Sequence, residues 1–425
     1  MPNFPSRLTP WLRLVSLALF ALTSACATRS HIPVAASHSA AESYLLLVSI
    51  DGFRADYLDR GVTPRLSALA AGGVRADALR PSFPSLTFPN HYTLVTGLRP
   101  DHHGIVHNRI QGNDGKISFV YNDARTTREA HWWGGEPIWV AAERHGLRSA
   151  TMFWPGSDTA IGGVRPSYWK PFDRNLGADA RVDTVLDWLD LPLAQRPRFI
   201  TLYFEQVDRA GHDYGPDSAE VNAVLAQIDA TLGRLLDGLE ARGLRRSLNL
   251  IVLSDHGQTP AGAEKLVLVD TVVDLERVQA VNLGVVAGFA PEPGQRRYAE
   301  SALLRPHPHM QCWRRGQMPA HFHYGTHARI PPIVCLAQQG WIMTTTSALA
   351  ARTSPPSLGE HGYDNTLPDM GALFVANGPA FRPGARVPVF DNVDVYPLLA
   401  HLLQVKPARN DGDARTLRLL LRDTD

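Results

Sequence analysis

The sequence predicts an α/β fold with a mostly parallel central sheet and helices on both faces. Apolar, β-branched runs alternate along the chain with segments of helical periodicity, a pattern typical of strand–helix–strand units. Three apolar runs stop at or just before acidic and imidazole side chains, at residues 44–50, 199–204 and 248–253. Because the carboxyl ends of parallel strands open into one crevice, we expect these side chains to converge.

Local patterns predict the elements in chain order. Residues 44–50 form a buried strand, residues 64–71, 89–96 and 136–144 form short helices, and residues 149–153 form a strand. An amphipathic helix at residues 181–189 precedes the strand at residues 199–204. Strands at residues 248–253 and 374–377 and a helix at residues 394–403 complete the core. The helix predicted at residues 218–242 has apolar side chains at a period of about 3.6 residues: Val221, Val224, Leu225, Ile228, Leu232, Leu235, Leu236 and Leu239.

Residues 42–259 and 351–425 are predicted as two parts of one catalytic core, with a small inserted subdomain at residues 260–350. The strand–helix rhythm is lost after Gln258, where the chain carries Pro291-Glu-Pro-Gly and Arg305-Pro-His-Pro-His. His361 then returns the chain to the edge of the core. A chain of 425 residues is long enough for one large domain with such an insertion.

Residues 1–27 have the pattern of a secretory signal peptide. Arg7 and Arg13 precede an apolar run at residues 14–22, which is too short to span a membrane as a mature helix. Two interpretations stay open, because Ala25-Cys26-Ala27 fits an A-x-A cleavage site and Ser24-Ala25-Cys26 resembles a lipoprotein box. Both predict an exported protein, periplasmic or secreted, and only the lipoprotein interpretation adds a membrane contact, through a lipid anchor at Cys26.

Composition and charge do not favour a nucleic-acid partner. The chain is 44% hydrophobic and 20% charged, with a net charge of +1 and no basic tract. A stable nucleic-acid complex normally needs a basic patch or stripe, so none is predicted.

Cys312 and Cys335 are the two cysteines that follow the leader. Cysteines in an oxidising compartment are more often paired than free, which favours a disulfide, and two buried free thiols are the alternative. Neither belongs to a C-x-x-C pair, so neither is predicted as a zinc ligand.

Two sets of three side chains are candidate metal ligands: Asp208, His212 and His361 in one, and Asp51, Asp255 and His256 in the other. Zinc prefers histidine nitrogen and carboxylate oxygen where thiolate is absent. The spacing of Asp208 and His212 fits one face of a helix, but Gly211 between them makes a loop after the strand equally possible. Two metal ions about 4 Å apart can hold the attacking and leaving oxygens of an in-line displacement.

Thr87 is the candidate nucleophile. It lies just before the predicted helix at residues 89–96, with Pro89 near the first helical position. A helix N-terminus offers free N–H groups and the positive end of the dipole to an anion. The alternative is that Thr87 is only an N-cap.

These motifs together resemble the nucleotide pyrophosphatase/phosphodiesterase family of the alkaline phosphatase superfamily. The matching segments occur in consistent order across residues 44–405. They are Ile50 to Arg54, Pro84 to Tyr92, His103 to Asn108, Trp132 to Trp139, Asp208 to His212, Ser254 to Gly257 and His361 to Asn365. Gln258 departs from the methionine that the family often shows there.

The resemblance implies an alkaline phosphatase-like fold and zinc-dependent hydrolysis of nucleotide phosphodiester and pyrophosphate bonds, releasing nucleoside 5′-monophosphates. It implies that Thr87 attacks phosphorus and forms a phospho-threonine intermediate. One of two Zn²⁺ ions would activate Thr87, held by Thr87 itself with Asp51, Asp255 and His256, and the other would stabilise the leaving oxygen. Asn108 matches an asparagine that donates to a non-bridging phosphate oxygen, and Phe88 and Tyr203 match rings that sandwich a nucleobase.

Two other functions stay open. A phosphodiesterase of choline-type phospholipid head groups belongs to the same superfamily but needs a choline pocket, which no segment of the sequence reveals. An exported zinc-binding protein without turnover is the non-enzymatic alternative, and the ligand set together with Thr87 and Asn108 argues against it. The remaining histidines near the motifs are expected to make caps and turn contacts: His102, His103 and His107.

Overall fold

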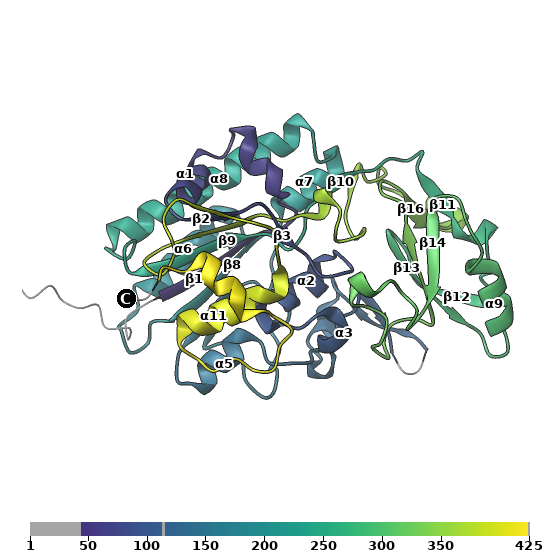
Figure 1. The fold of residues 1–425 in the computed structure, drawn as a ribbon, viewed down its shortest axis with the longest axis horizontal. Helices are drawn as coiled ribbons and strands as arrows, with labels where there is room; N and C mark the ends of the chain where they lie inside the picture. Colours follow the sequence, from purple (N-terminus) through teal and green to yellow (C-terminus); the bar gives the residue numbers. More distant parts are fainter. Residues whose placement is uncertain (1–43, 113–114, 424–425) are drawn as a thin grey trace, which may run out of the picture. The chain divides into compact units, whose positions relative to one another are not determined.

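An eight-stranded sheet forms the centre of the fold in this computed structural model, which describes residues 44–112 and 115–423 (Figure 1). Its strands lie in the order β19 (Ala385–Val387), β2 (Val74–Ala76), β18 (Phe374–Asn377), β9 (Leu248–Leu253), β1 (Tyr44–Ile50), β8 (Phe199–Phe204), β6 (Ser149–Met152) and β7 (Tyr168–Lys170). β18 is antiparallel to both neighbours, and every other neighbouring pair is parallel. The predicted mostly parallel sheet is therefore confirmed.

Helices cover both faces of this sheet, as predicted. One face packs against α1 (Pro64–Ala71), α6 (Ala178–Leu189), α7 (Gln206–Tyr214) and α8 (Ala219–Ala241). The other packs against α2 (Thr87–Thr96), α5 (Ile138–Arg144) and α11 (Val395–Leu403), and Figure 1 shows the two layers. Side chains of β1 alternate between them, because Leu46 and Val48 join the first core and Leu45 and Leu47 the second.

Several predicted elements differ from the observed ones only at their ends. The helix predicted at residues 89–96 begins at Thr87, which is therefore a helical residue and not an N-cap. Ser218 caps α8 by accepting a hydrogen bond from the backbone N–H of Val221, so that helix begins one residue later than predicted. β6 ends one residue early, because Phe153 has a left-handed φ of 61° that a strand does not accommodate.

A second sheet lies between β9 and β18 in the chain. It is antiparallel, in the order β12 (Val278–Asn282), β13 (Val286–Pro291), β15 (Ile333–Ala337) and β14 (Met310–Arg314), with α9 (Arg296–Leu303) between β13 and β14 in the chain. Short pairs are β3 (Leu79–Arg80) with β20 (Phe390–Asp391), β4 (Arg109–Gln111) with β5 (Ile117–Val120), β10 (Thr259–Pro260) with β17 (Gly359–Glu360), and β11 (Leu266–Leu268) with β16 (Ile342–Thr344). Short helices are α3 (Pro100–His103), α4 (Ala124–Thr127), α10 (Thr346–Ala350) and α12 (Leu417–Leu420). The boundaries of an inserted subdomain at residues 260–350 stay a prediction.

Cys312 and Cys335 form a disulfide across neighbouring strands of the second sheet. The favoured pairing is confirmed, and the alternative of two free thiols is wrong. The signal peptide predicted at residues 1–27, with Cys26, lies outside the described residues. Among the residues that the structure describes, no helix is long and apolar enough to cross a membrane.

Candidate active site

Three neighbouring parallel strands deliver most of the predicted ligands to one edge of the central sheet. Asp51 follows β1, Asp255 and His256 follow β9, and α7, which carries Asp208, follows β8. β1 pairs with both β8 and β9, so their carboxyl ends lie side by side. His361 comes directly after β17, and Thr87 begins α2.

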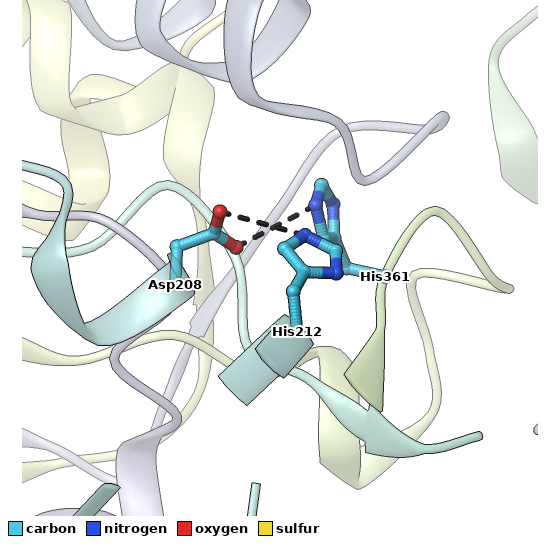
Figure 2. Close-up of side chains that lie close together, drawn as sticks. All are labelled: Asp208, His212 and His361. Atoms are coloured by element: carbon cyan, nitrogen blue, oxygen red, sulfur yellow. Dashed lines mark ion pairs between the residues drawn. The ribbon is translucent and has the colours of Figure 1, made fainter. Parts of the chain in front are cut away.

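The first ligand set is assembled around the Asp208 carboxylate (Figure 2). Oδ2 of Asp208 lies 3.5 Å from Nε2 of His212, and Oδ1 lies 3.6 Å from Nε2 of His361. Asp208 and His212 are both on α7, so of the two local structures left open by the spacing, the helix is the observed one. The predicted set of three is brought together.

Hydrogen bonds fix the histidines with Nε2 available to a metal ion. Nδ1 of His361 donates to the Ser85 carbonyl at 2.8 Å, and Nδ1 of His256 donates to the Gly257 carbonyl at 3.1 Å. Nδ1 of His212 lies 3.1 Å from Oγ of Ser357, which itself donates to the Gly359 carbonyl. Each Nδ1 therefore carries a hydrogen, which leaves Nε2 as the nitrogen that can coordinate a metal ion.

The second set, Asp51, Asp255 and His256, converges on two carboxylate oxygens that lack a hydrogen-bond partner. Nε2 of His256 lies 3.0 Å from Oδ2 of Asp255 and 3.5 Å from Oδ1 of Asp51. These two oxygens are buried and without a hydrogen bond among the described residues. A buried orphan carboxylate oxygen is costly, and a cation between the two would satisfy both. The residues present therefore fit a metal ion.

The acidic groups of this centre perturb one another. Burial, together with the nearby charges of Asp255 and Asp208, raises the pKa of Asp51 well above its usual range. Burial also acts to raise the pKa of Asp255, but His256 and His91 outweigh it and hold that pKa well below the usual range. Burial and the neighbouring His256 lower the pKa of His361 to about 3. A cationic cofactor would stabilise these neighbouring carboxylates, of which Asp51 and Asp255 are buried and Asp208 is partly buried.

Thr87 and Asn108 meet at the first turn of α2. Oγ1 of Thr87 lies 3.3 Å from Nε2 of His256, which places the candidate nucleophile beside the second ligand set. Oδ1 of Asn108 accepts the backbone N–H of Phe88 at 3.1 Å. A backbone N–H can only donate, so the amide oxygen faces it and the NH₂ group of Asn108 stays free to donate elsewhere.

The two predicted substrate rings have different surroundings. Phe88 is partly exposed and packs against Phe119, Tyr121 and Trp133. Tyr203 is 9% exposed, and its hydroxyl donates to Oδ2 of Asp51 at 2.6 Å. The geometry favours a role for Tyr203 in holding Asp51, whereas base stacking by either ring stays a prediction.

Two residues at the site were missed by sequence reasoning. His91 lies close to Asp51 and Asp255, and its place four residues after Thr87 on α2 was the available signal. Gln258 donates from Nε2 to Oδ1 of Asp208 at 2.7 Å and to its backbone carbonyl at 2.9 Å. Gln258 was noticed in the sequence only as a departure from methionine, and no local pattern predicts its contact.

The fold and the ligand sets define a class of α/β protein that can hold metal at the carboxyl edge of a parallel sheet. The model of the family "Type I phosphodiesterase / nucleotide pyrophosphatase" matches residues 45–364, and the chain belongs to this family. The predicted family and the prediction of a hydrolase are therefore confirmed.

Relatives and solved structures agree with this family. The chain is 37% identical to an uncharacterized pyrophosphatase/phosphodiesterase of Schizosaccharomyces pombe, over 87% of this chain and 79% of that protein. It is 37% identical to bovine ectonucleotide pyrophosphatase/phosphodiesterase family member 3, over 89% of this chain but only 44% of the bovine protein. The structure of murine ectonucleotide pyrophosphatase/phosphodiesterase 5 matches with a TM-score of 0.84 and 33% identity, covering 89% of this chain and all of that one. An inactive threonine-to-alanine variant of that murine protein was solved in complex with AMP.

Proposed function

We propose that the chain is a zinc-dependent enzyme that hydrolyses nucleotide phosphodiester and pyrophosphate bonds and releases nucleoside 5′-monophosphates. The observation that carries the proposal is the Thr87 hydroxyl 3.3 Å from Nε2 of His256, beside two orphaned carboxylate oxygens. The names of the relatives support the substrate class, and the AMP complex of the murine neighbour supports nucleotide binding.

Thr87 is proposed to act as the nucleophile. A bond forms between its Oγ1 and phosphorus as the bond from phosphorus to the leaving oxygen breaks, giving a phospho-threonine whose phosphorus still carries the nucleoside. Attack by water then breaks the bond to Oγ1, restores the hydroxyl and releases the monophosphate. The murine variant that lacks a threonine hydroxyl and is described as inactive supports this role.

The chain's own groups hold the phosphate during this exchange. The NH₂ group of Asn108 is the end of the amide that does not bond Phe88, so it can donate to the phosphate. The backbone N–H of Thr87 begins α2 and lies at the positive end of the helix dipole, whereas the N–H of Phe88 is already bonded to Asn108. One hydrogen-bond donor directed at the phosphate oxygens that gain charge stabilises the transition state by about 3 kcal/mol.

Two Zn²⁺ ions are proposed as the cofactors, one for each ligand set. Asp208, His212 and His361 would hold one ion; Asp51, Asp255 and His256, with Thr87, would hold the other. When bound, zinc supplies positive charge to the attacking and leaving oxygens. The imidazole and carboxylate donors suit this metal.

A diester or pyrophosphate carries a second substituent that needs a surface to pack against. The partly exposed ring of Phe88 offers one, and stacking on an aromatic ring is worth about 1–3 kcal/mol per base. We therefore propose nucleotides over simple phosphate monoesters, with Phe88 as the stacking residue. The pattern of residues 1–27 supports export to the periplasm or the medium, with Cys26 as the lipid attachment point in the lipoprotein alternative.

Three chromogenic substrates test the proposal. The purified chain is expected to show its highest kcat/KM on p-nitrophenyl TMP, a lower value on p-nitrophenyl phosphorylcholine and the lowest on p-nitrophenyl phosphate. A preference for the choline ester would favour a head-group phosphodiesterase, and a preference for the monoester would overturn the assignment. No turnover of any of the three would favour a zinc-binding protein.

A further inference from the structure

His91 lies where three elements of the site meet. It is fully buried on α2, four residues after Thr87, and its two ring nitrogens face β1 on one side and Asp255 on the other. We propose that His91 is a positioning residue whose Nδ1–H keeps the Thr87 backbone and the Asp255 carboxylate in fixed places relative to each other. This inference rests on the proposed function, because it takes Thr87 as the nucleophile and Asp255 as a metal ligand.

The surroundings of Nδ1 define what this nitrogen does. It lies 3.0 Å from the carbonyl oxygen of Thr87 and 3.2 Å from Oδ2 of Asp255. The Thr87 carbonyl can only accept, so Nδ1 carries a hydrogen atom and donates it there, while Oδ2 of Asp255 lies beside this N–H at ion-pair distance without a hydrogen bond. A nitrogen that carries hydrogen has no lone pair for a metal ion. His91 is therefore not the ligand that its distance from Asp51 and Asp255 alone would indicate.

The other nitrogen and the ring faces hold His91 in place. Nε2 lies 2.9 Å from Oγ of Ser49 on β1, two residues before Asp51, and accepts its hydrogen. Trp154 and Tyr203 contact the ring edge-to-face, with centroids at 5.0 Å and 5.1 Å. The indole N–H of Trp154 donates to the backbone carbonyl of His91 at 3.0 Å. The donor at Nδ1 is therefore preorganised.

The oxygen that His91 contacts is the one that faces the metal centre. Oδ2 of Asp255 lies 3.0 Å from Nε2 of His256, whereas Oδ1 is near the backbone N–H of Gly52 and the hydroxyl of Ser254. Because His91 holds Oδ2 in place, it also holds the oxygen that Asp255 offers to the second ligand set. The same N–H fixes the first turn of α2, from which the Thr87 hydroxyl projects. Replacing a residue that orients a metal ligand typically lowers metal affinity by about 10- to 100-fold.

Two amide variants separate the role of Nδ1 from that of Nε2. The amide nitrogen of His91→Asn reaches the place of Nδ1, and that of His91→Gln reaches the place of Nε2. Both are neutral and polar, so they form a matched pair. Zinc affinity is measured by competition with a chromogenic chelator on the full chain, together with kcat and KM on p-nitrophenyl TMP.

His91→Asn is expected to stay within about fivefold of the parent in zinc affinity, and His91→Gln to lose about 10- to 100-fold at one of two sites. Among the described residues, none of the ring contacts of His91 reaches Asp208, His212 or His361, so the other zinc site serves as an internal control. In His91→Gln, kcat is expected to fall more than KM rises. Ser49→Ala, which leaves Nδ1 between its two oxygen neighbours, is expected to keep zinc affinity within about threefold.

Equal zinc affinity in the Asn and Gln variants would overturn the proposal. So would a drop in melting temperature without any change in zinc affinity, because that is the signature of a merely structural residue. If a variant does not fold, as judged by far-UV circular dichroism, Ser49→Ala decides: a tenfold loss of zinc affinity in it would also overturn the proposal. A parent that binds zinc but turns over no nucleotide would refute the proposed function and leave the zinc comparison intact.

Discussion

The hydroxyl group of Thr87 projects from the first turn of α2 toward His256. Thr87→Ala is expected to lower kcat on p-nitrophenyl TMP by at least about a thousandfold, because it removes the attacking oxygen while the other ligands remain. Thr87→Ser keeps a hydroxyl and should retain measurable turnover. A value for Thr87→Ala within about tenfold of the parent would mean that water attacks phosphorus directly.

The hydroxyl of Tyr203 is bonded to Asp51, and its ring is almost fully buried. Tyr203→Phe removes the hydroxyl and keeps the ring, so it separates the two roles considered for this residue. A role in holding Asp51 predicts the same loss of kcat, about 10-fold or more, on p-nitrophenyl TMP and on p-nitrophenyl methyl phosphate. If Tyr203→Phe keeps full activity on both substrates, the hydroxyl is not needed to hold Asp51, and base stacking by the ring is the role that remains.

Within α7, Gly211 lies between the candidate metal ligands Asp208 and His212. Alanine is normally preferred over glycine in a helix by about 1 kcal/mol. Here a Cβ on Gly211 would overlap the side-chain amide of Gln258, which donates to Asp208. The glycine is therefore explained by a contact with another segment and not by the helix itself.

Gly211→Ala is expected to lower kcat/KM by at least tenfold and to weaken zinc binding at the Asp208 site, since the new Cβ displaces Gln258. The matched test is a double-variant cycle with Gln258→Ala. With the smaller side chain at position 258, Gly211→Ala should add little further loss. If Gly211→Ala lowers kcat/KM by the same factor with glutamine and with alanine at position 258, the overlap with Gln258 is not the cause of the loss.

The central strands and helices could be predicted from the sequence because buried elements carry strong apolar periodicity. β1, β8 and β9 are predicted to the residue, since each is a mostly apolar run ended by a turn or a polar residue. Helix starts were less predictable, because Ser218 acts as a cap whereas Thr87 enters the helix. Both residues have a hydroxyl side chain, and only the backbone conformation distinguishes them.

The convergence of the candidate ligands could be predicted because Asp51 and His361 directly follow strands, Asp255 comes just after one, and Asp208 lies in the segment after the strand at residues 199–204. The hydrogen bonds that hold the candidate ligands in place could not be predicted, because they join segments that lie far apart in the chain. Gln258 and Asp208 are an example, since neither segment alone indicates that their side chains meet. The burial of Tyr203 likewise depends on rings contributed by α2 and by Phe172.

For the protein as a whole, the proposed function predicts two zinc ions per chain, one for each ligand set. Chelator treatment is expected to abolish activity on p-nitrophenyl TMP, and added zinc to restore it. His361→Ala should lose chiefly the ion of the Asp208 set, because that residue contributes its imidazole there. Elemental analysis of active protein with fewer than one transition metal per chain would contradict the proposal.

Two buried histidines outside the metal centre bear on stability over the whole molecule. Burial lowers the pKa of His103 to about 3 and that of His107 to about 4. His103 is held by the Thr93 hydroxyl at Nε2 and by the N–H of Ile105 at Nδ1. In the unfolded chain a histidine has a pKa of about 6.5. At a pH between the folded-state and the unfolded-state pKa of each histidine, the unfolded chain therefore binds more protons than the folded protein.

The neutral histidines therefore contribute fully to the free energy of unfolding above about pH 6.5. As the pH falls toward their pKa values in the folded protein, the free energy of unfolding decreases by up to about 1.4 kcal/mol per pH unit for each histidine. We expect His103→Asn, which does not titrate and keeps an acceptor for the N–H of Ile105, to show a shallower decline between pH 6.5 and 4.5. The measurement is the free energy of unfolding in urea for both proteins across that range. Zinc release on acidification affects both proteins alike, so the difference in slope isolates His103. Parallel declines would show that His103 becomes protonated in the folded state as readily as in the unfolded chain.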